Sequence, residues 1–128
     1  MTNQKEVYKC EICGNIVEVI HSGAGALVCC GQPMKLLIEN ADEKAAVEKH
    51  VPIIVGKNRK KVKVGEKKHP MEDNHYIEWI EATCETKSGN EEICKIFLKP
   101  GMKPEAKFKN KIANARAYCN LHGLWKTI

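Results

Sequence analysis

A cysteine and a histidine stand three positions apart near the end of the chain, in Tyr118-Cys119-Asn120-Leu121-His122-Gly123. A turn at this spacing can bring the cysteine sulfur and a ring nitrogen to the same side, so that both bind one metal ion. Three more histidines, His50, His69 and His75, come from separate upstream segments, so only a folded domain can bring the five together. A structural zinc site takes four ligands in total. Four imidazoles and one thiolate therefore predict a different site, with four nitrogens around a metal, one sulfur beneath it and an open position above.

Four other cysteines form a second candidate metal site, made of Cys10-x-x-Cys13 and the adjacent pair Cys29-Cys30. Four thiolates make a closed, tetrahedral site that suits iron or zinc, and the spacing alone leaves these two metals open. Neighbouring side chains of a strand point to opposite faces, so the adjacent pair predicts a distorted tetrahedron. Four cysteine ligands leave no position for a substrate, and we expect no catalysis there.

The 128 residues fit one domain or two small ones. Turns at Gly14-Asn15 and Ser22-Gly23-Ala24-Gly25 separate short apolar runs, and so short a piece needs a metal, disulfides or a partner for stability. Later in the chain, apolar and polar residues alternate in short runs such as Lys61-Val62-Lys63-Val64. This pattern predicts a mainly β protein. We expect a metal-binding domain at 1–38, a linker at 39–47 and a β-sandwich domain at 48–128.

Composition narrows the class of protein. The apolar stretches are too short to span a membrane, and the start of the chain lacks the apolar core of a signal peptide, so we expect a cytoplasmic protein. Seven cysteines could form a secreted disulfide framework. The odd number and the metal-like cluster instead favour thiols in a reducing compartment.

The formal net charge of +5 is unevenly distributed. Residues 1–40 hold three basic and four acidic residues, a net −1, which leaves +6 on the remainder. A basic second domain attracts small anions. Seven of the basic residues lie between Lys57 and Lys68. A nucleic-acid patch is one interpretation, but alternation with Val62 and Val64 and the lack of nearby aromatic residues favour a solvated strand face. We therefore expect no nucleic-acid partner.

Six segments together resemble the desulfoferrodoxin family, the two-iron superoxide reductases. They are 7–19 (VYKCEICGNIVEV), 48–52 (EKHVP), 69–72 (HPME), 75–81 (HYIEWIE), 97–101 (FLKPG) and 118–123 (YCNLHG). The resemblance extends from residue 6 to Lys126 and implies a desulforedoxin-like domain followed by an immunoglobulin-like, seven-stranded β-sandwich. The resemblance favours iron over zinc at the first site. It also implies that this iron transfers electrons in addition to stabilising the fold. That Fe(Cys)4 site would use Cys10, Cys13, Cys29 and Cys30.

The resemblance also implies the chemistry of the second site. Cys119 would be the axial ligand of a ferrous iron, and its sixth coordination position would be open. Four histidines would surround the iron, namely His50, His69, His75 and His122. Superoxide would take up one electron there and, with two protons, become hydrogen peroxide without producing dioxygen. Lys49 would attract superoxide and assist its protonation, and Glu48 would bind the ferric iron after turnover.

The family further implies a rubredoxin-like electron donor and a homodimer. Two other functions stay open from the residues alone. A pure electron-transfer iron protein needs no open metal position, and a zinc-stabilised binding module leaves the five ligands of the second site unexplained. His21 falls outside the family pattern and is interpreted as solvated, and Trp79 and Trp125 are interpreted as core residues.

Cys84 and Cys94 belong to neither metal site. A hairpin centred on Gly89 would oppose them directly, at a distance that a disulfide can bridge. Two hypotheses follow. The two cysteines are either small buried apolar residues in a reducing cytoplasm or an oxidisable pair that closes under peroxide.

Overall fold

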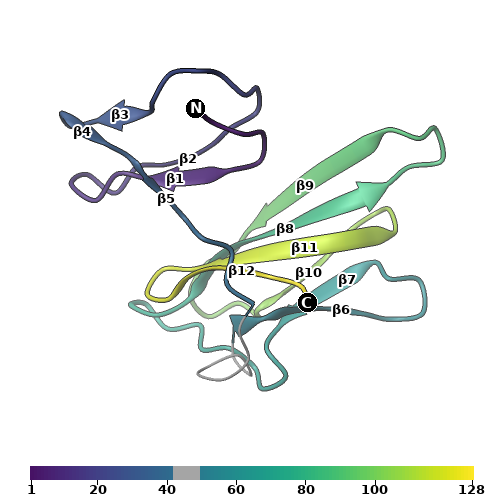
Figure 1. Ribbon diagram of the computed structural model, residues 1–128. Helices are drawn as coiled ribbons and strands as arrows, with labels where there is room; N and C mark the ends of the chain where they lie inside the picture. Colours follow the sequence, from purple (N-terminus) through teal and green to yellow (C-terminus); the bar gives the residue numbers. More distant parts are fainter. Residues whose placement is uncertain (42–49) are drawn as a thin grey trace. The chain divides into compact units, whose positions relative to one another are not determined.

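The computed structural model describes residues 1–41 and 50–128, and these are almost entirely strands and turns (Figure 1). Two compact units follow one another along the chain, Met1–Ile38 and Glu39–Ile128. The strands of the first unit are β1 (Val7–Lys9), β2 (Ile16–Glu18), β3 (Val28–Cys29), β4 (Gln32–Pro33) and β5 (Lys35–Leu36). Those of the second are β6 (Pro52–Val55), β7 (Lys61–Val64), β8 (Ile77–Glu85), β9 (Glu91–Phe97), β10 (Glu105–Lys107), β11 (Ile112–Cys119) and β12 (Gly123–Lys126).

The first unit consists of a sheet in the order β2-β1-β5 and a ribbon formed by β3 and β4. Its strands have only two or three residues each. Val7 and Cys10 are among its few buried side chains, at 1% and 3% exposed. So small a core cannot stabilise a fold by apolar burial alone, as the sequence predicted. The additional stabilisation has to come from the cysteines or from a partner.

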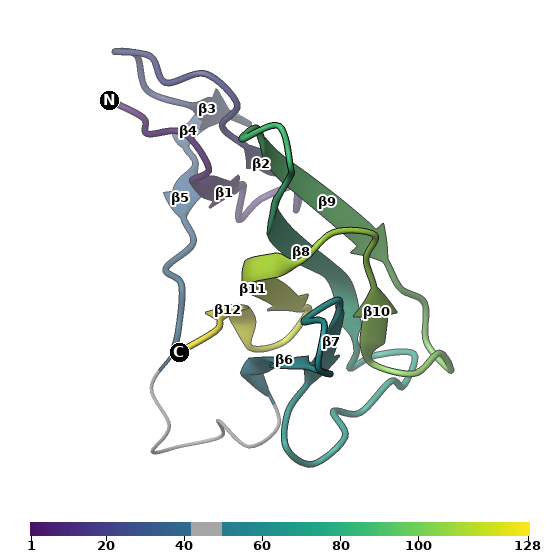
Figure 2. The ribbon, with the colours of Figure 1, turned by 90° about the vertical axis from the view of Figure 1, so that its right-hand side faces the viewer.

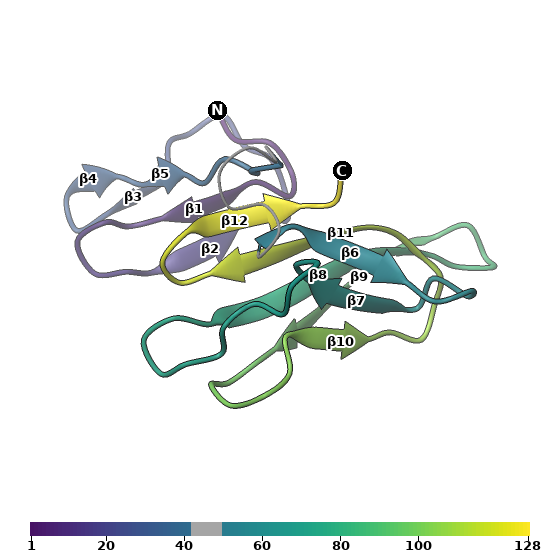
Figure 3. The same cartoon turned by 90° about the horizontal axis from the view of Figure 1, so that it is seen from below.

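The second unit is a β-sandwich of two sheets, as predicted. One sheet has the order β10-β7-β6 and the other β12-β11-β8-β9, which makes seven strands (Figures 2 and 3). The alternating run on β7 is explained by this arrangement, because Val62 and Val64 are 0% and 1% exposed while Lys61 and Lys63, which alternate with them, are only partly buried. The inner faces of the two sheets share one apolar cluster that includes Ile80, Ile112 and Cys119. The fold is therefore mainly β, a small domain of short strands followed by the seven-stranded sandwich.

The register of the β8–β9 hairpin differs from the predicted one. Cys84 lies opposite Glu92 and Cys94 lies opposite Ala82, so the two cysteines are diagonal neighbours, whose Cα atoms are typically about 7–8 Å apart. Both are free thiols. The prediction was wrong because Gly89, at φ +84°, is the last of three loop residues and not their midpoint. A direct Cys84–Cys94 disulfide does not fit this register.

The chain leads into the second unit along β12. The Asn40 amide donates to the Leu124 carbonyl at 2.8 Å, and the Lys126 amide donates to the Asn40 carbonyl at 3.0 Å. Most of the predicted linker, residues 42–47, lies outside the described residues. Within the described residues, the structure has no helix of the length and apolar character needed to cross a membrane.

Candidate metal centres

The four cysteines of the first unit converge. Their sulfur atoms all lie within 4.8 Å of one another, and the Cys29 sulfur is 3.5 Å from that of Cys13 and 3.9 Å from that of Cys30. Cys13 and Cys30 are exposed at the surface of the unit. A compact set of four sulfurs matches a closed, soft, tetrahedral metal site.

Two tight turns bring these sulfurs together. After Cys10-x-x-Cys13, Gly14 takes the left-handed conformation at φ +85° and its amide donates to the Cys10 carbonyl. In the β3–β4 hairpin, Cys29 pairs with Gln32, and the loop residues Cys30 and Gly31 both have positive φ, at 52° and 75°. These are the dihedral signs of a type I′ turn. The turn rotates Cys30 out of the strand geometry, so adjacent cysteines can face one ion although neighbours in a strand point apart.

The protonation of the cysteines depends on their immediate surroundings. The pKa of Cys10 is lowered to about 6, chiefly because the Cys13 amide donates to its sulfur. The pKa of Cys30 is raised to about 12, chiefly by its contact with the Cys13 thiol. Without a cation, four sulfurs this close cannot all be thiolates. A bound metal ion would remove this conflict, so the donor set fits a metal.

The four predicted histidines of the second unit form a closed ring. The centroids of neighbouring imidazoles are 4.8 Å apart for His50 and His69, 4.9 Å for His69 and His75, 5.0 Å for His75 and His122, and 4.7 Å for His122 and His50. Each neighbouring pair meets edge to face. Across the ring, His50 and His75 are 6.4 Å apart. Four imidazoles so arranged surround a common centre.

Cys119 lies against this ring and is fully buried. Its sulfur is 3.8 Å from Nδ1 of His122, which in turn is 3.0 Å from Nε2 of His50. The candidate ligand atoms of His50, His75, Cys119 and His122 all lie within 4.8 Å of one another. His69 is outside that tightest group, although its ring contacts both His50 and His75.

Two ring nitrogens in the cluster have no hydrogen-bond partner among the described residues. They are Nε2 of His69 and Nε2 of His75, and both are buried. Nδ1 of His69 lies 2.7 Å from the Pro70 carbonyl, which can only accept, so Nδ1 carries the proton and Nε2 has a free lone pair. Buried polar atoms without a partner are rare because they are costly. Lone pairs of this kind fit a metal ion at the centre of the ring.

Burial also sets the protonation of the site. The pKa of His69 is lowered to about 4, first by burial and then by the other histidines of the ring, so its imidazole is neutral near pH 7. The neutral form is the one that binds metals. Burial raises the pKa of Cys119, and the backbone amides of Leu121 and His122 oppose that shift. Amides directed at the sulfur favour the thiolate.

A hairpin and one asparagine hold the ligand segments together. Cys119 pairs with Gly123 at the end of the β11–β12 hairpin, which leaves His122 in a three-residue loop. The Asn120 side chain accepts from the Tyr76 amide at 3.0 Å and donates to the Asn74 carbonyl at 3.1 Å. Asn120 thus fastens the loop of His75 to the loop of Cys119 and His122. Asn120 was assigned no role from the sequence, although its position between Cys119 and His122 could have indicated one.

Trp125 contacts two of the four histidines. Its indole stacks on His50 at 4.8 Å with 19° between the planes, and its Nε1–H donates to the His122 carbonyl at 3.0 Å. Trp125 is buried, as a core residue would be, but it also orients the metal site. Among the described residues, Trp79 has no ring contact with the four histidines. It stacks on Tyr118, and the Lys95 ammonium lies over the Trp79 ring. The interpretation as a core residue is therefore sufficient for Trp79, but for Trp125 it leaves out the contacts with the histidines.

Three other predicted positions complete the comparison with the sequence. Glu48 and Lys49 lie outside the described residues, so their predicted roles remain predictions. His21 is exposed in the first unit, as expected for a solvated residue.

Fold and sites together define a two-domain metalloprotein with a cysteine centre and a histidine–cysteine centre. Residues 2–37 match the family model described as the desulfoferrodoxin N-terminal domain, and residues 42–128 match the one described as desulfoferrodoxin. The chain belongs to the desulfoferrodoxin family, as the resemblance implied.

Individual proteins agree with this assignment. The chain is 55% identical over 129 aligned positions to desulfoferrodoxin of Nitratidesulfovibrio vulgaris, with 98% of each chain covered. It is 51% identical to a desulfoferrodoxin homolog of Archaeoglobus fulgidus, with 99% of each covered. Among solved structures, the superoxide reductase of Treponema pallidum matches with a TM-score of 0.72 and 26% identity, and each chain is covered completely.

Proposed function

We propose that this protein is a superoxide reductase, which reduces superoxide by one electron to hydrogen peroxide without releasing dioxygen. The observation that carries the proposal is the closed ring of four imidazoles with the buried Cys119 sulfur against it. Solved structures similar to this chain include superoxide reductases from Treponema pallidum and Nanoarchaeum equitans. Membership in the desulfoferrodoxin family supports the same activity.

The second centre would hold iron through the four histidine nitrogens and the Cys119 thiolate. When bound, that iron supplies the electron that superoxide takes up. The four imidazoles are neutral as ligands, and the thiolate carries a single negative charge, so a divalent ion would keep a net positive charge that attracts an anionic substrate. The Cys119 thiolate would donate electron density to the ion, comparable to the push of a haem thiolate. The amides of Leu121 and His122 moderate this donation by partly neutralising the sulfur.

Two residues outside the described part of the chain complete the proposal. Lys49 would attract superoxide and assist its protonation, and Glu48 would supply a carboxylate able to bind the iron. Lys49→Ala should slow the second-order reaction with superoxide and weaken its dependence on salt. Identical rates and salt slopes in the two proteins would remove Lys49 from the mechanism.

The first centre would hold a second iron on Cys10, Cys13, Cys29 and Cys30. Four sulfur ligands leave it without a substrate position, so its roles are folding and one-electron storage. We further propose that the domains divide at 1–38, 39–47 and 48–128, that the protein works in the reducing cytoplasm, and that a rubredoxin-like protein is the electron donor.

A homodimer is part of the proposal because the first unit exposes apolar side chains that its own core does not cover. Ile20 is 81% exposed and Val28 is 61% exposed, and Ile12 and Val17 are also exposed. A second copy of the chain could bury such a surface. Analytical ultracentrifugation should give twice the 14.4 kDa mass of the chain, and a monomer at micromolar concentration would remove this part of the proposal.

The stoichiometry of the reaction tests the function most simply. A reductase supplied with a one-electron donor forms one hydrogen peroxide for each superoxide consumed, whereas a dismutase forms one for every two and releases dioxygen. We expect the first ratio, iron at both sites and no dioxygen. The ratio of a dismutase, or no consumption by the iron-loaded protein, would contradict the proposal. A pure electron-transfer protein or a zinc-stabilised binding module would not need the histidine ring.

A further inference from the structure

Two lysine-rich segments that are distant in the sequence become one surface in the fold. Strand β7 pairs with β10, which aligns Lys63 with Glu105 and Lys61 with Lys107. Two more hydrogen bonds extend this alignment, from the Phe108 amide to the Lys60 carbonyl and from the Ile112 amide to the Arg59 carbonyl, both at 2.8 Å. The segments 57–68 and 103–111 therefore lie side by side. We call the surface that they form the basic face.

The charge of the basic face exceeds that of the whole protein. Its two segments contain eleven basic residues and two acidic ones, a net charge of +9. Since the whole chain carries +5, the rest of the chain carries −4. Within the described part of this face, Lys61 forms an ion pair with Glu105 at 3.3 Å. Ordinary protein surfaces intersperse both signs of charge, so alternation along a solvated strand does not account for so large a local excess.

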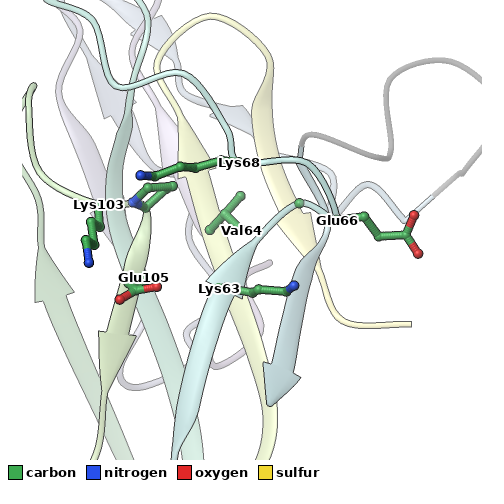
Figure 4. Close-up of a pocket in the computed structure, with 8 residues that line it drawn as sticks. Lys63, Val64, Glu66, Lys68, Lys103 and Glu105 are labelled. Carbon is green, nitrogen blue, oxygen red and sulfur yellow. The ribbon is translucent and has the colours of Figure 1, made fainter. Parts of the chain in front are cut away.

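The basic face contains a hollow of about 290 Å³ beside β7 and β10. Val64 and Pro104 line it together with three lysines, Lys63, Lys68 and Lys103, and two glutamates, Glu66 and Glu105. The side chains of Lys68 and Lys103 extend to the same side, and Glu66 points away from both (Figure 4). Glu105 pairs with Lys61 at 3.3 Å, so the side of the hollow that carries Lys68 and Lys103 can receive a carboxylate-bearing surface.

The hollow adjoins the histidine ring through the backbone. Lys68 immediately precedes His69, and the His69 amide donates to the carbonyl of Val64, a lining residue, at 3.4 Å. A molecule seated there lies next to a segment that carries one of the four proposed ligands.

We infer that the basic face is the docking surface for an acidic one-electron carrier protein, which restores the reduced state after each turnover. This inference rests on the proposed function, because each superoxide reduced consumes one electron that a donor must replace. The donor loses one electron, the oxidised protein gains it, and no bond is made or broken. Opposite charges on the two surfaces accelerate the encounter and orient it.

The composition of the basic face favours a protein over a nucleic acid. Phe108 is the aromatic residue in the two segments, and it is 9% exposed. Single-stranded nucleic acid is held by bases stacked on exposed aromatic rings, and the face presents none in the described structure. Duplex DNA, which needs only the phosphate contacts, is left as an outcome of the test.

The test compares two charge-reversal variants with the same net charge. Lys68→Glu/Lys103→Glu changes the hollow, and Lys87→Glu/Lys126→Glu changes two exposed lysines outside the basic face. The probe is rubredoxin, a small acidic electron carrier. Binding is measured by NMR titration with both proteins oxidised, so that no electron moves. Reduction by reduced rubredoxin and reaction with superoxide are then followed separately by rapid mixing.

We expect Lys68→Glu/Lys103→Glu to weaken binding and slow reduction by rubredoxin at low salt by about tenfold or more, and the control variant to change each by less than about twofold. Equal loss in both variants, or loss in neither, would overturn the inference. Tighter binding of duplex DNA than of rubredoxin, lost in the same variant, would also overturn it. If superoxide oxidises none of the proteins, the proposed function fails, but the binding titration still decides whether the face docks an acidic protein.

Discussion

The two metal centres obtain their ligands in different ways. The cysteine centre takes all four sulfurs from two turns between Cys10 and Cys30, and two of these sulfurs are exposed. The histidine centre takes its ligands from separate segments between His50 and His122, and three of its candidate ligands, His50, His69 and Cys119, are at most 2% exposed. A local, exposed centre needs little of the fold around it. A non-local, buried one exists only when the sandwich has folded.

This difference implies a difference in how metal and fold depend on each other. In the first unit, a bound metal would supply much of the folding free energy, because the apolar core is very small. In the second unit, the apolar cluster between the sheets holds the ligand segments before any metal binds. Damage to one centre should therefore stay within its own unit, and the variants below test this expectation.

The largest effect is expected from Cys119→Ser. Serine keeps the size of the side chain but removes the thiolate, so activity should fall by at least about 100-fold, more than loss of an outer hydrogen bond would cause. The thiolate-to-iron absorption of the second centre should disappear, while that of the first centre stays. Unchanged activity in a variant that retains its iron would disprove the role of Cys119.

Cys13→Ser should affect the first unit and leave the second unit unchanged. Loss of one ligand from the cysteine centre should abolish or strongly weaken metal binding there and remove amide hydrogen-exchange protection from the first unit. Protection in the second unit should be unchanged. Simultaneous loss of protection in both units would show that the two centres are not independent.

Acid should destabilise the metal-free second unit. The pKa of His69 is about 4 in the folded protein, below its ordinary value of 6.5, so the unfolded chain binds more protons between these values. Stability is therefore complete above pH 6.5 and is lost as the pH falls toward 4, by on the order of 3 kcal/mol. Urea titrations of the metal-free protein across this range measure the loss. His69→Gln should flatten the dependence, and a His21→Gln control that flattened it equally would contradict the assignment to His69.

The smallest effect is expected from Trp125→Phe. Phenylalanine keeps a flat ring against His50 but cannot donate to the His122 carbonyl, so metal affinity at the second centre should fall about tenfold. Competition with a chelator measures the change. Trp79→Phe is the matched control, because Trp79 stacks on Tyr118 and not on the histidine ring. Equal losses in the two variants would mean that Trp125 acts through core packing alone.

The sequence allowed the local parts of this architecture to be predicted. The turn at Cys10-x-x-Cys13 and the strand at the alternating run on β7 could be predicted from a few neighbouring residues, because turns and strands are short-range features. The set of four histidines and one cysteine suggested their grouping, and the family resemblance supported it. Spacing alone cannot show that these segments meet, since they do so only through long-range strand pairing.

The remaining features depended on geometry that a pattern does not contain. The hairpin register failed because Gly89 fits either the middle or the end of a turn, and only the hydrogen bonds distinguish them. The adjacent cysteines needed a positive φ at Cys30, a conformation uncommon for residues other than glycine. Trp125 looked like any buried aromatic residue until its two histidine contacts were visible. The basic face required the pairing of β7 with β10.

The most direct test of the account is rapid mixing of superoxide with the Cys13→Ser variant, loaded with iron at the second centre alone. The account predicts that superoxide oxidises this iron at the rate found for the unmodified protein, within about twofold, and that one hydrogen peroxide forms for each iron oxidised. A second-centre iron that superoxide leaves unoxidised, or that reacts only when the first centre is intact, would contradict the claim that the histidine–cysteine centre is the site of reaction.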